Sequence, residues 1–319
     1  MNRDIIVIGA SAGGFEVLLS LAGELPRDLP AAIFVVLHRA AGDRAHLPEL
    51  LSERGRMPAR HPLHEERIAN GIIYIAPPDN HLLLRHGSVQ VVRGPKENGH
   101  RPAVDALFRS ASAAYGSRVI GVVLSGYQDC GTAGMMSIKA RGGVSVVQAP
   151  ESAVASEMPG SVLQRVAVDH VASPRDLAQL LVRLVSEPAG NDRPAESTIA
   201  QLEGAAPGAP AQVVCPLCQG VLTEAQPGVF EHFRCHVGHS FSMESLVREQ
   251  SESMERALWA AVRALEESAT LSRRLSTRDT SELRRRFEEK AVTQSEHAER
   301  LRQILLHGSM LSPADANGL

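Results

Sequence analysis

The chain has 319 residues, of which 44% are hydrophobic, and its formal net charge at pH 7 is -3. This length suggests two domains or one domain with an appendage, and the apolar content excludes wholesale disorder. Aromatic residues make up only 3% of the chain and no basic excess exists, so we expect no nucleic-acid partner. The longest apolar stretches are too short for a signal peptide or a membrane span, so we expect no membrane insertion and a cytoplasmic location.

From residue 1 to about 186, short apolar and β-branched runs alternate with helical patterns. The runs typical of strands that are buried on both faces cover residues 5–8, 32–37, 119–124 and 144–147. The helical patterns cover residues 15–25, 45–54, 103–115 and 134–141. This alternation predicts an α/β domain with a doubly wound, mostly parallel sheet. An excursion over residues 71–94, with Pro and Gly turns, is expected to form antiparallel β-hairpins instead.

The C-terminal third changes character three times. Residues 187–211 are rich in Pro, Ala and Gly and are predicted to be a linker, and residues 212–240 form a compact region with three cysteines. Residues 241–308 carry two helical patterns, with apolar faces at Leu246, Met254, Leu258, Ala261 and Leu265 and at Leu283, Phe287, Leu301 and Leu305. We interpret them as an α-helical hairpin that serves packing or homo-oligomer formation, and binding of a receptor or another partner is the alternative.

The segment Gly9–Gly13 lies between the first predicted strand and the first predicted helix, and it contains Ser11. Glycines allow a tight turn, and the start of the helix offers N–H groups and the positive end of its dipole. A serine at this place resembles the nucleophile elbow of a hydrolase. The alternative is a phosphate or dinucleotide loop, but Ser11 stands where the dinucleotide pattern requires its second glycine.

His38 lies at the end of the next predicted strand. Consecutive strand ends in a doubly wound sheet open onto one crevice, so His38 is a candidate base for Ser11, although a structural histidine is the alternative. A serine–histidine pair needs a third group that orients the imidazole ring. The loop 126–131, "GYQDCG", follows the strand at 119–124 and presents Asp129 and Cys130 side by side.

Five motifs together resemble the catalytic domain of the chemotaxis protein-glutamate methylesterases (CheB-type) over roughly residues 3 to 184. They are "VIGASAGG", "VLHR", "YIAPPDNHLLL", "NGHRPAVDALFRS" and "LSGYQDCGTAGM", in this order. The resemblance implies a Rossmann-like hydrolase with a serine–histidine–aspartate triad, in which Ser11 is the nucleophile and His38 the base. It also implies that the substrates are glutamate methyl esters, and in many members glutamines, on methyl-accepting chemoreceptor-like proteins.

The third member of the triad departs from the family. In the family's "GxxxDG" loop the catalytic aspartate directly precedes the glycine, and this position is Cys130 here, with Asp129 one residue earlier. Three interpretations remain: Asp129 orients His38 after a small backbone shift, Cys130 does so as a thiolate, or the triad is impaired. We favour Asp129 slightly, because the glycine after Cys130 can absorb the backbone adjustment.

The family also carries an N-terminal receiver domain that controls access to the active site. In this sequence the region of resemblance begins at residue 3, so we expect that switch to be missing. Control of activity would then come from elsewhere, and the C-terminal third is the candidate.

The compact region is predicted to bind zinc. Cys215 and Cys218 form a Cys-x₂-Cys pair, and Cys235 with His239 completes a Cys₃His set, for which His236 competes. Four protein ligands leave no open position, so the zinc is structural, and we expect no cofactor for catalysis. Metal would stabilise a region of about thirty residues, which is too short for a hydrophobic core of its own.

These observations predict a serine-type carboxylic ester hydrolase that removes methyl esters from glutamate side chains of chemoreceptor-like proteins. The alternative is a signalling adaptor with the methylesterase fold and an impaired triad, because Cys130 stands at the aspartate position. A small-molecule esterase of the α/β-hydrolase type is disfavoured, because those enzymes place the acid between serine and histidine along the chain.

Overall fold

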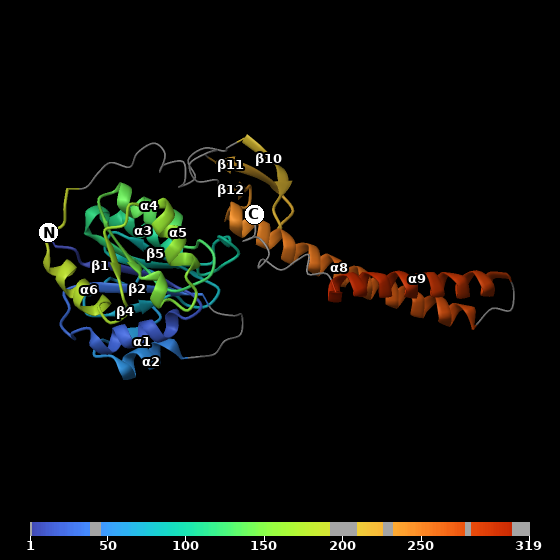
Figure 1. The fold of residues 1–319 in the computed structure, drawn as a ribbon, viewed down its shortest axis with the longest axis horizontal. Coiled ribbons are helices and arrows are strands. Elements are labelled where there is room, and N and C mark those ends of the chain that lie inside the picture. The colour runs from blue at the N-terminus through green and yellow to red at the C-terminus, as the bar shows by residue number, and fades with distance from the viewer. Residues whose placement is uncertain (1, 39–45, 192–208, 226–231, 278–281, 308–319) are drawn as a thin grey trace. The chain divides into compact units, whose positions relative to one another are not determined.

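A seven-stranded parallel sheet forms the centre of the first half of the chain (Figure 1). In the computed structural model, which describes residues 2–38, 46–191, 209–225, 232–277 and 282–307, the strand order is β3-β4-β2-β1-β7-β8-β9. The strands are β1 (Ile5–Ala10), β2 (Ala32–Leu37), β3 (Ala59–Arg60), β4 (Ile73–Ile75), β7 (Val119–Val123), β8 (Val144–Gln148) and β9 (His170–Ala172). β1 lies at the centre of the sheet, between β2 and β7. The strands β3 and β4, which follow β2, lie on one side of β1, and β8 and β9, which follow β7, lie on the other, so the strand order reverses at β1.

Helices cover both faces of this sheet (Figure 1). Side chains of α1 (Gly14–Glu24), α2 (Leu47–Arg54) and α6 (Leu177–Ser186) share one apolar core with Ile6 and Ile8. Side chains of α3 (Val104–Tyr115), α4 (Thr132–Ala140) and α5 (Glu157–Arg165) share the other with Ile5 and Val7. Because β1, β2, β7 and β8 are buried along their whole length, their sequences are largely apolar, and this is why the four predicted strands could be recognised. Two short 3₁₀ helices, η1 (Gly116–Arg118) and η2 (Pro150–Ser152), lie in the connections.

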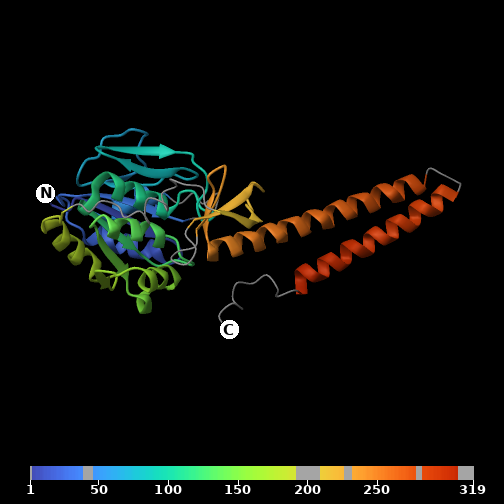
Figure 2. The same cartoon turned by 90° about the horizontal axis from the view of Figure 1, so that it is seen from above.

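The excursion between β4 and α3 forms one antiparallel hairpin of β5 (His81–Arg85) and β6 (Ser88–Val92), which Figure 2 shows at the edge of the domain. Leu82, Leu84 and Val89 of the hairpin share the core of α3. The prediction of antiparallel hairpins over all of residues 71–94 was wrong for β4, which pairs in parallel with β2 and β3. This strand has three residues, too few to show whether it is buried on one face or on two.

The compact region with three cysteines forms a four-stranded antiparallel sheet, with Cys235 in a strand and Cys215 and Cys218 in the turn between two strands. Its strands are β10 (Ala209–Val214), β11 (Val221–Ala225), β12 (His232–Cys235) and β13 (Ser240–Ser242), and they pair in chain order. We call residues 209–242 the cysteine module. Most of the predicted linker, residues 192–208, lies outside the described residues. The module belongs to the same compact unit as the parallel sheet, Met1–Ser245.

The second compact unit, Leu246–Leu319, contains most of α8 (Met243–Ser276) and all of α9 (Glu282–His307). The helices run side by side as the expected hairpin (Figures 1 and 2), and the turn predicted between them lies largely outside the described residues. Small side chains dominate the seam, where the buried residues are Val262, Ala269, Ser272, Ser276, Ala291 and Ala298. Gln294 on α9 donates to Ser268 on α8 at 2.7 Å. None of the helices described is both long and apolar enough to cross a bilayer.

Candidate active site

Hydrogen bonds between the backbones of neighbouring strand ends bring the three predicted motifs to one edge of the sheet. The N–H of Ser11, after β1, donates to the carbonyl of Ser125, after β7, at 2.9 Å. The N–H of His38, after β2, donates to the carbonyl of Ala10 at 2.9 Å. This edge is the carboxyl side of the sheet at the point where the strand order reverses, the usual ligand-binding place of an open α/β sheet.

The turn from β1 into α1 depends on two glycines. Gly13 has φ 77°, a left-handed conformation that lets the helix begin at Gly14, directly after Ser11 and Ala12. Gly126 in the facing loop lies so close to Ser11 that a Cβ atom there would come within 2.7 Å of the Ser11 Cβ. Ser11 therefore lies next to the first N–H groups of α1, which the helix itself does not use.

The imidazole of His38 stacks on that of His100, with ring centroids 3.8 Å apart and planes 13° from parallel. The thiol of Cys130 joins these rings, because its sulfur and one nitrogen of each ring all lie within 4.8 Å of one another. Cys130 is buried. The side chain that the loop after β7 presents to His38 is thus the cysteine at the family's aspartate position.

Asp129 is also buried, but its hydrogen bond goes elsewhere. Its Oδ1 accepts from the hydroxyl of Ser242 at 2.9 Å. Its Oδ2 is buried and has no hydrogen-bond partner among the described residues. Burial, together with the negative charge of Glu244, raises the pKa of Asp129 to about 7. The carboxyl is therefore partly protonated at neutral pH, so it supplies less negative charge than an ordinary aspartate.

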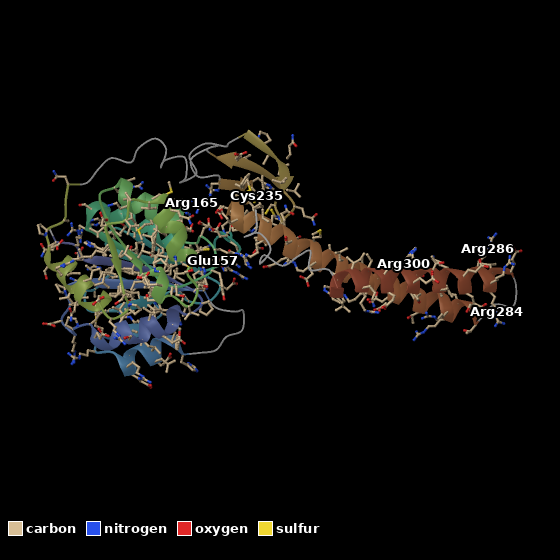
Figure 3. The ribbon with its side chains drawn as sticks, in the orientation of Figure 1. Glu157, Arg165, Cys235, Arg284, Arg286 and Arg300 are labelled. Carbon is tan, nitrogen blue, oxygen red and sulfur yellow. The ribbon has the colours of Figure 1, made fainter. Side chains whose placement is uncertain are left out.

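Two acidic side chains hold the loop between β7 and α4. Asp105, at the start of α3, accepts from the N–H groups of Gly131 at 3.1 Å and Gly134 at 2.8 Å. Glu157, labelled in Figure 3, accepts from the N–H of Gln128 at 2.7 Å. No role was predicted for Asp105 or His100, although both lie in the motif "NGHRPAVDALFRS". Membership of this motif was the one sequence feature that could have marked them as site residues.

The cysteine module brings Cys215, Cys218, Cys235 and His239 together. Cys215 Sγ and Cys235 Sγ each lie 3.6 Å from His239 Nδ1, and Cys218 Sγ lies 3.6 Å from Cys235 Sγ. Ligands of a tetrahedral zinc ion lie about 3.5–3.8 Å apart, given zinc–sulfur and zinc–nitrogen bonds of about 2.3 and 2.1 Å. The four side chains can therefore hold a metal ion of this size and geometry.

The competing histidine lies outside this group. The His236 side chain is exposed, and its ring lies against Gly220, where a Cβ atom would come within 2.4 Å of it. Because Gly220 has no side chain, the turn after Cys218 can approach this ring. The geometry therefore favours His239 over His236 as the fourth ligand.

Residues 6–181 match the family described as CheB methylesterase. The chain belongs to this family. It is 35% identical over 185 residues to a "Putative protein-glutamate methylesterase/protein-glutamine glutaminase" of Leptospira interrogans, covering 58% of this chain and 96% of that protein. It is 36% identical over 191 residues to "Protein-glutamate methylesterase/protein-glutamine glutaminase 2" of Methanosarcina acetivorans, covering 57% of this chain and 54% of that protein. The chain thus matches about half the length of this second relative.

A solved structure of the family supports the same assignment of the fold. The crystal structure of the Thermotoga maritima CheB methylesterase catalytic domain superposes with a TM-score of 0.55 at 32% identity. The superposition covers 58% of this chain and 100% of that domain. The CheB fold therefore accounts for the parallel sheet and its helices, and the family match ends before the cysteine module.

The raised pKa of Asp129 predicts how stability depends on pH. Between about pH 4 and pH 7 the unfolded chain loses this proton while the folded chain keeps it, so the free energy of unfolding falls as pH rises. Asp129→Asn retains the acceptor for Ser242 and removes the charge, so it should abolish this slope. At pH 8 we expect the variant to be more stable by about 1–4 kcal/mol, and below pH 4 the difference should vanish.

Denaturant unfolding of both proteins from pH 3.5 to pH 8.5 measures this difference. Asp176→Asn is a matched control, because the Asp176 side chain lies on the surface and accepts from Ser173 three residues away. An Asp129→Asn variant whose stability follows the wild-type pH dependence would contradict the prediction.

The cysteine module should contain about one zinc ion per chain when the protein is purified without added metal. Cys218→Ser should lower the zinc content by at least about tenfold, because three ligands bind zinc far more weakly than four. His236→Ala should leave it unchanged. Elemental analysis measures the zinc content of each protein. Loss of zinc in His236→Ala with retention in His239→Ala would reverse the assignment of the fourth ligand.

Proposed function

We propose that this CheB-family chain is a cytoplasmic serine hydrolase that removes methyl esters from glutamate side chains of chemoreceptor-like proteins. Deamidation of glutamine side chains would use the same site. One observation carries the proposal: Ser11 lies in the tight turn before α1, and His38 lies at the adjacent strand end. The two relatives are named protein-glutamate methylesterase/protein-glutamine glutaminase, and these names support glutamate methyl esters and glutamines of proteins as the substrate class.

In the proposed reaction the Ser11 hydroxyl attacks the ester carbonyl carbon while His38 takes its proton. The oxyanion that forms faces the N–H groups at the start of α1 and the positive end of the helix dipole. The intermediate collapses with release of methanol, or ammonia from glutamine, after His38 returns the proton to the leaving group. Water, deprotonated by His38, then cleaves the acyl-enzyme and gives the glutamate side chain and free Ser11.

The third group of the triad is proposed to be Cys130. Its thiol lies with the His38 and His100 rings, whereas Asp129 is hydrogen-bonded to Ser242. A thiol orients an imidazole less well than a carboxylate and, when neutral, does not stabilise the imidazolium that forms during attack. The proposal that Asp129 takes this role instead requires its carboxyl to leave Ser242. We therefore expect turnover below that of a complete serine–histidine–aspartate triad.

A second candidate function is a signalling adaptor with the methylesterase fold. The observation that favours it is the same pair of residues: a cysteine at the aspartate position, and an adjacent aspartate whose hydrogen bond goes to Ser242. In this case the surface of the fold would bind a receptor without useful hydrolysis. The two candidates differ in whether Ser11 contributes to the rate.

Substitutions of the two loop residues distinguish the interpretations of the triad. Cys130→Asp should raise methyl ester hydrolysis by about 10²–10⁴, because it restores a charge beside His38. Asp129→Asn should change the rate less than about threefold if Cys130 is the third group, and lower it by about 10³–10⁴ if Asp129 is. Methanol release from a methylated chemoreceptor fragment gives the rates, with Ser11→Ala as the baseline.

Near-ultraviolet circular dichroism of each variant controls for folding in this series. A wild-type rate equal to that of Ser11→Ala would reject the enzymatic proposal for this chain. If the rate of Cys130→Asp also did not exceed that of Ser11→Ala, the signalling adaptor would describe this chain better. A substantial wild-type rate that thiol alkylation abolishes would establish Cys130 as the third group.

We also propose that α8 joins two copies of the chain. On α8, a second apolar stripe lies beside the seam with α9, at Met254, Ala257, Ala261, Ala264, Leu271 and Leu275. The three large residues of this stripe are 45–58% exposed. An antiparallel second copy centred on Ala264 would place large Leu271 against small Ala257. This match in size favours a second copy as the partner.

The oligomeric state tests this surface. Leu271→Glu should shift the protein from dimer to monomer in light scattering after size-exclusion chromatography, because it places two charges in the pairing stripe. Glu267→Lys lies on an exposed part of the same helix outside the stripe, and it should leave the mass unchanged. A wild-type protein that is monomeric at about 100 µM, a weak affinity for a specific dimer, would exclude the proposal.

A further inference from the structure

The cysteine module lies against the segment 95–100, which precedes α3. Ser240 of β13 donates through its N–H to the Lys96 carbonyl at 3.3 Å, and its own carbonyl accepts from the N–H of Asn98 at 2.7 Å. Gly238 approaches Pro95 so closely that a Cβ atom at Gly238 would come within 3.0 Å of the proline ring. β13 therefore adds to this segment as a short parallel partner, with Ser240 bridged to Glu97.

A buried amide side chain extends this contact. Oδ1 of Asn98 accepts from the N–H of Ser242 at 2.9 Å and from the hydroxyl of Ser245 at 2.8 Å. Nδ2 of Asn98 donates to Oδ2 of Asp105 at 3.3 Å. The side chain is 6% exposed, and φ of 51° is a left-handed conformation that asparagine tolerates. Asn98 thus connects the module with the acid that holds the loop after β7.

Residues on both sides of Asn98 contact the candidate active site. His100, two residues after Asn98, stacks on the His38 ring. Asp105 binds the N–H groups of Gly131, which follows Cys130, and of Gly134 in the first turn of α4. The hydroxyl of Ser242 binds Asp129 directly. The module is therefore linked to His38 through the segment 96–100, and it contacts the loop after β7 directly at Asp129.

Metal binding in the module would affect these contacts, because a metal ligand is adjacent in sequence to β13. His239 directly precedes Ser240, and the N–H of Cys235 donates to the His239 carbonyl at 3.0 Å. A metal ion that holds Cys235 and His239 would therefore hold β13. Without a metal the module has few buried apolar residues to keep this strand in place; they include Leu222, Phe233 and Phe241.

We propose that the metal-bound cysteine module is a positioning element of the active site, and that it acts through Asn98 and Ser242. It holds the turn that carries His100 and the loop that carries Asp129 and Cys130, and thereby the geometry around His38. The effect on turnover rests on the proposed esterase function. The effect on local order does not, so the two can fail separately.

The experiment uses the full-length, zinc-loaded protein and three variants. Ser242→Ala removes the contact with Asp129, Asn98→Gly removes the amide and keeps the backbone conformation accessible, and Cys218→Ser weakens the metal site. Ser251→Ala is the matched control, because the Ser251 hydroxyl donates to the Val247 carbonyl of its own helix, far from residues 95–100 in the sequence. Each variant is measured for kcat and KM with the methylated receptor fragment, and for amide hydrogen exchange.

We expect kcat to fall by about 10- to 100-fold in all three variants, as displacement of a catalytic group by about 1 Å can cause, with KM changed less than about threefold. Exchange at residues 96–100 should rise by at least about tenfold in the three variants and in protein treated with a chelator. Ser251→Ala should match the wild type in every measurement, and β7 should keep its protection throughout.

Repeating the exchange measurement in the Ser11→Ala background separates the two proposals. If the wild type shows no hydrolysis but the exchange at residues 96–100 responds as stated, the positioning role stands and the esterase function fails. Unchanged exchange at residues 96–100 after loss of zinc would overturn the positioning role. A rise of kcat in Ser242→Ala would also overturn it, because the contact would then restrain activity.

Discussion

The candidate active site depends on the parallel pairing of three strands, β2, β1 and β7, whose carboxyl ends meet. Two backbone hydrogen bonds at this edge, from Ser11 to Ser125 and from His38 to Ala10, continue the register of the sheet into the loops. The side chains that follow are therefore placed by the sheet, which is buried on both faces and close-packed. A catalytic geometry requires this kind of support, because small displacements of the reacting groups lower the rate strongly.

The loop after β7 places the buried thiol of Cys130 beside the imidazole of His38. Burial makes an isolated carboxylate costly, and the raised pKa of Asp129 is a consequence of that cost. A cysteine at position 130 avoids the cost because a thiol is easily buried. It also lacks the permanent charge that a triad uses when the imidazolium forms. Position 130 thus carries an easily buried side chain without a permanent charge.

The cysteine module illustrates how a small region can contribute order to a larger one. Its sheet has few buried apolar side chains, and the four clustered side chains can hold a metal ion, which would add stability. Once ordered, it satisfies polar groups of the neighbouring domain that are buried, among them Oδ1 of Asn98 and Oδ1 of Asp129. Buried polar groups of this kind strongly favour one arrangement over others, because each lost hydrogen bond costs the full desolvation of the group.

The α/β class, the long strands, the cysteine cluster and the helical hairpin could all be predicted from the sequence, because each depends on local periodicity or spacing. Continuous apolar runs such as residues 32–37 are legible without knowledge of their neighbours, and so is a Cys-x₂-Cys pair. Five motifs in register also identified the CheB family, which the profile match over residues 6–181 confirms.

Features that depend on contacts between distant segments could not be predicted and became visible in the folded chain. β4 was misassigned because three residues carry no period, and its parallel partners lie elsewhere in the chain. Periodicity could not tell which of two adjacent side chains, Asp129 or Cys130, would face His38, because a loop has no fixed alternation. Nor could it reveal Ser242, which meets Asp129 from 113 positions further along the chain. Sequence spacing reports local geometry, whereas hydrogen bonds across such separations exist only once the chain has folded.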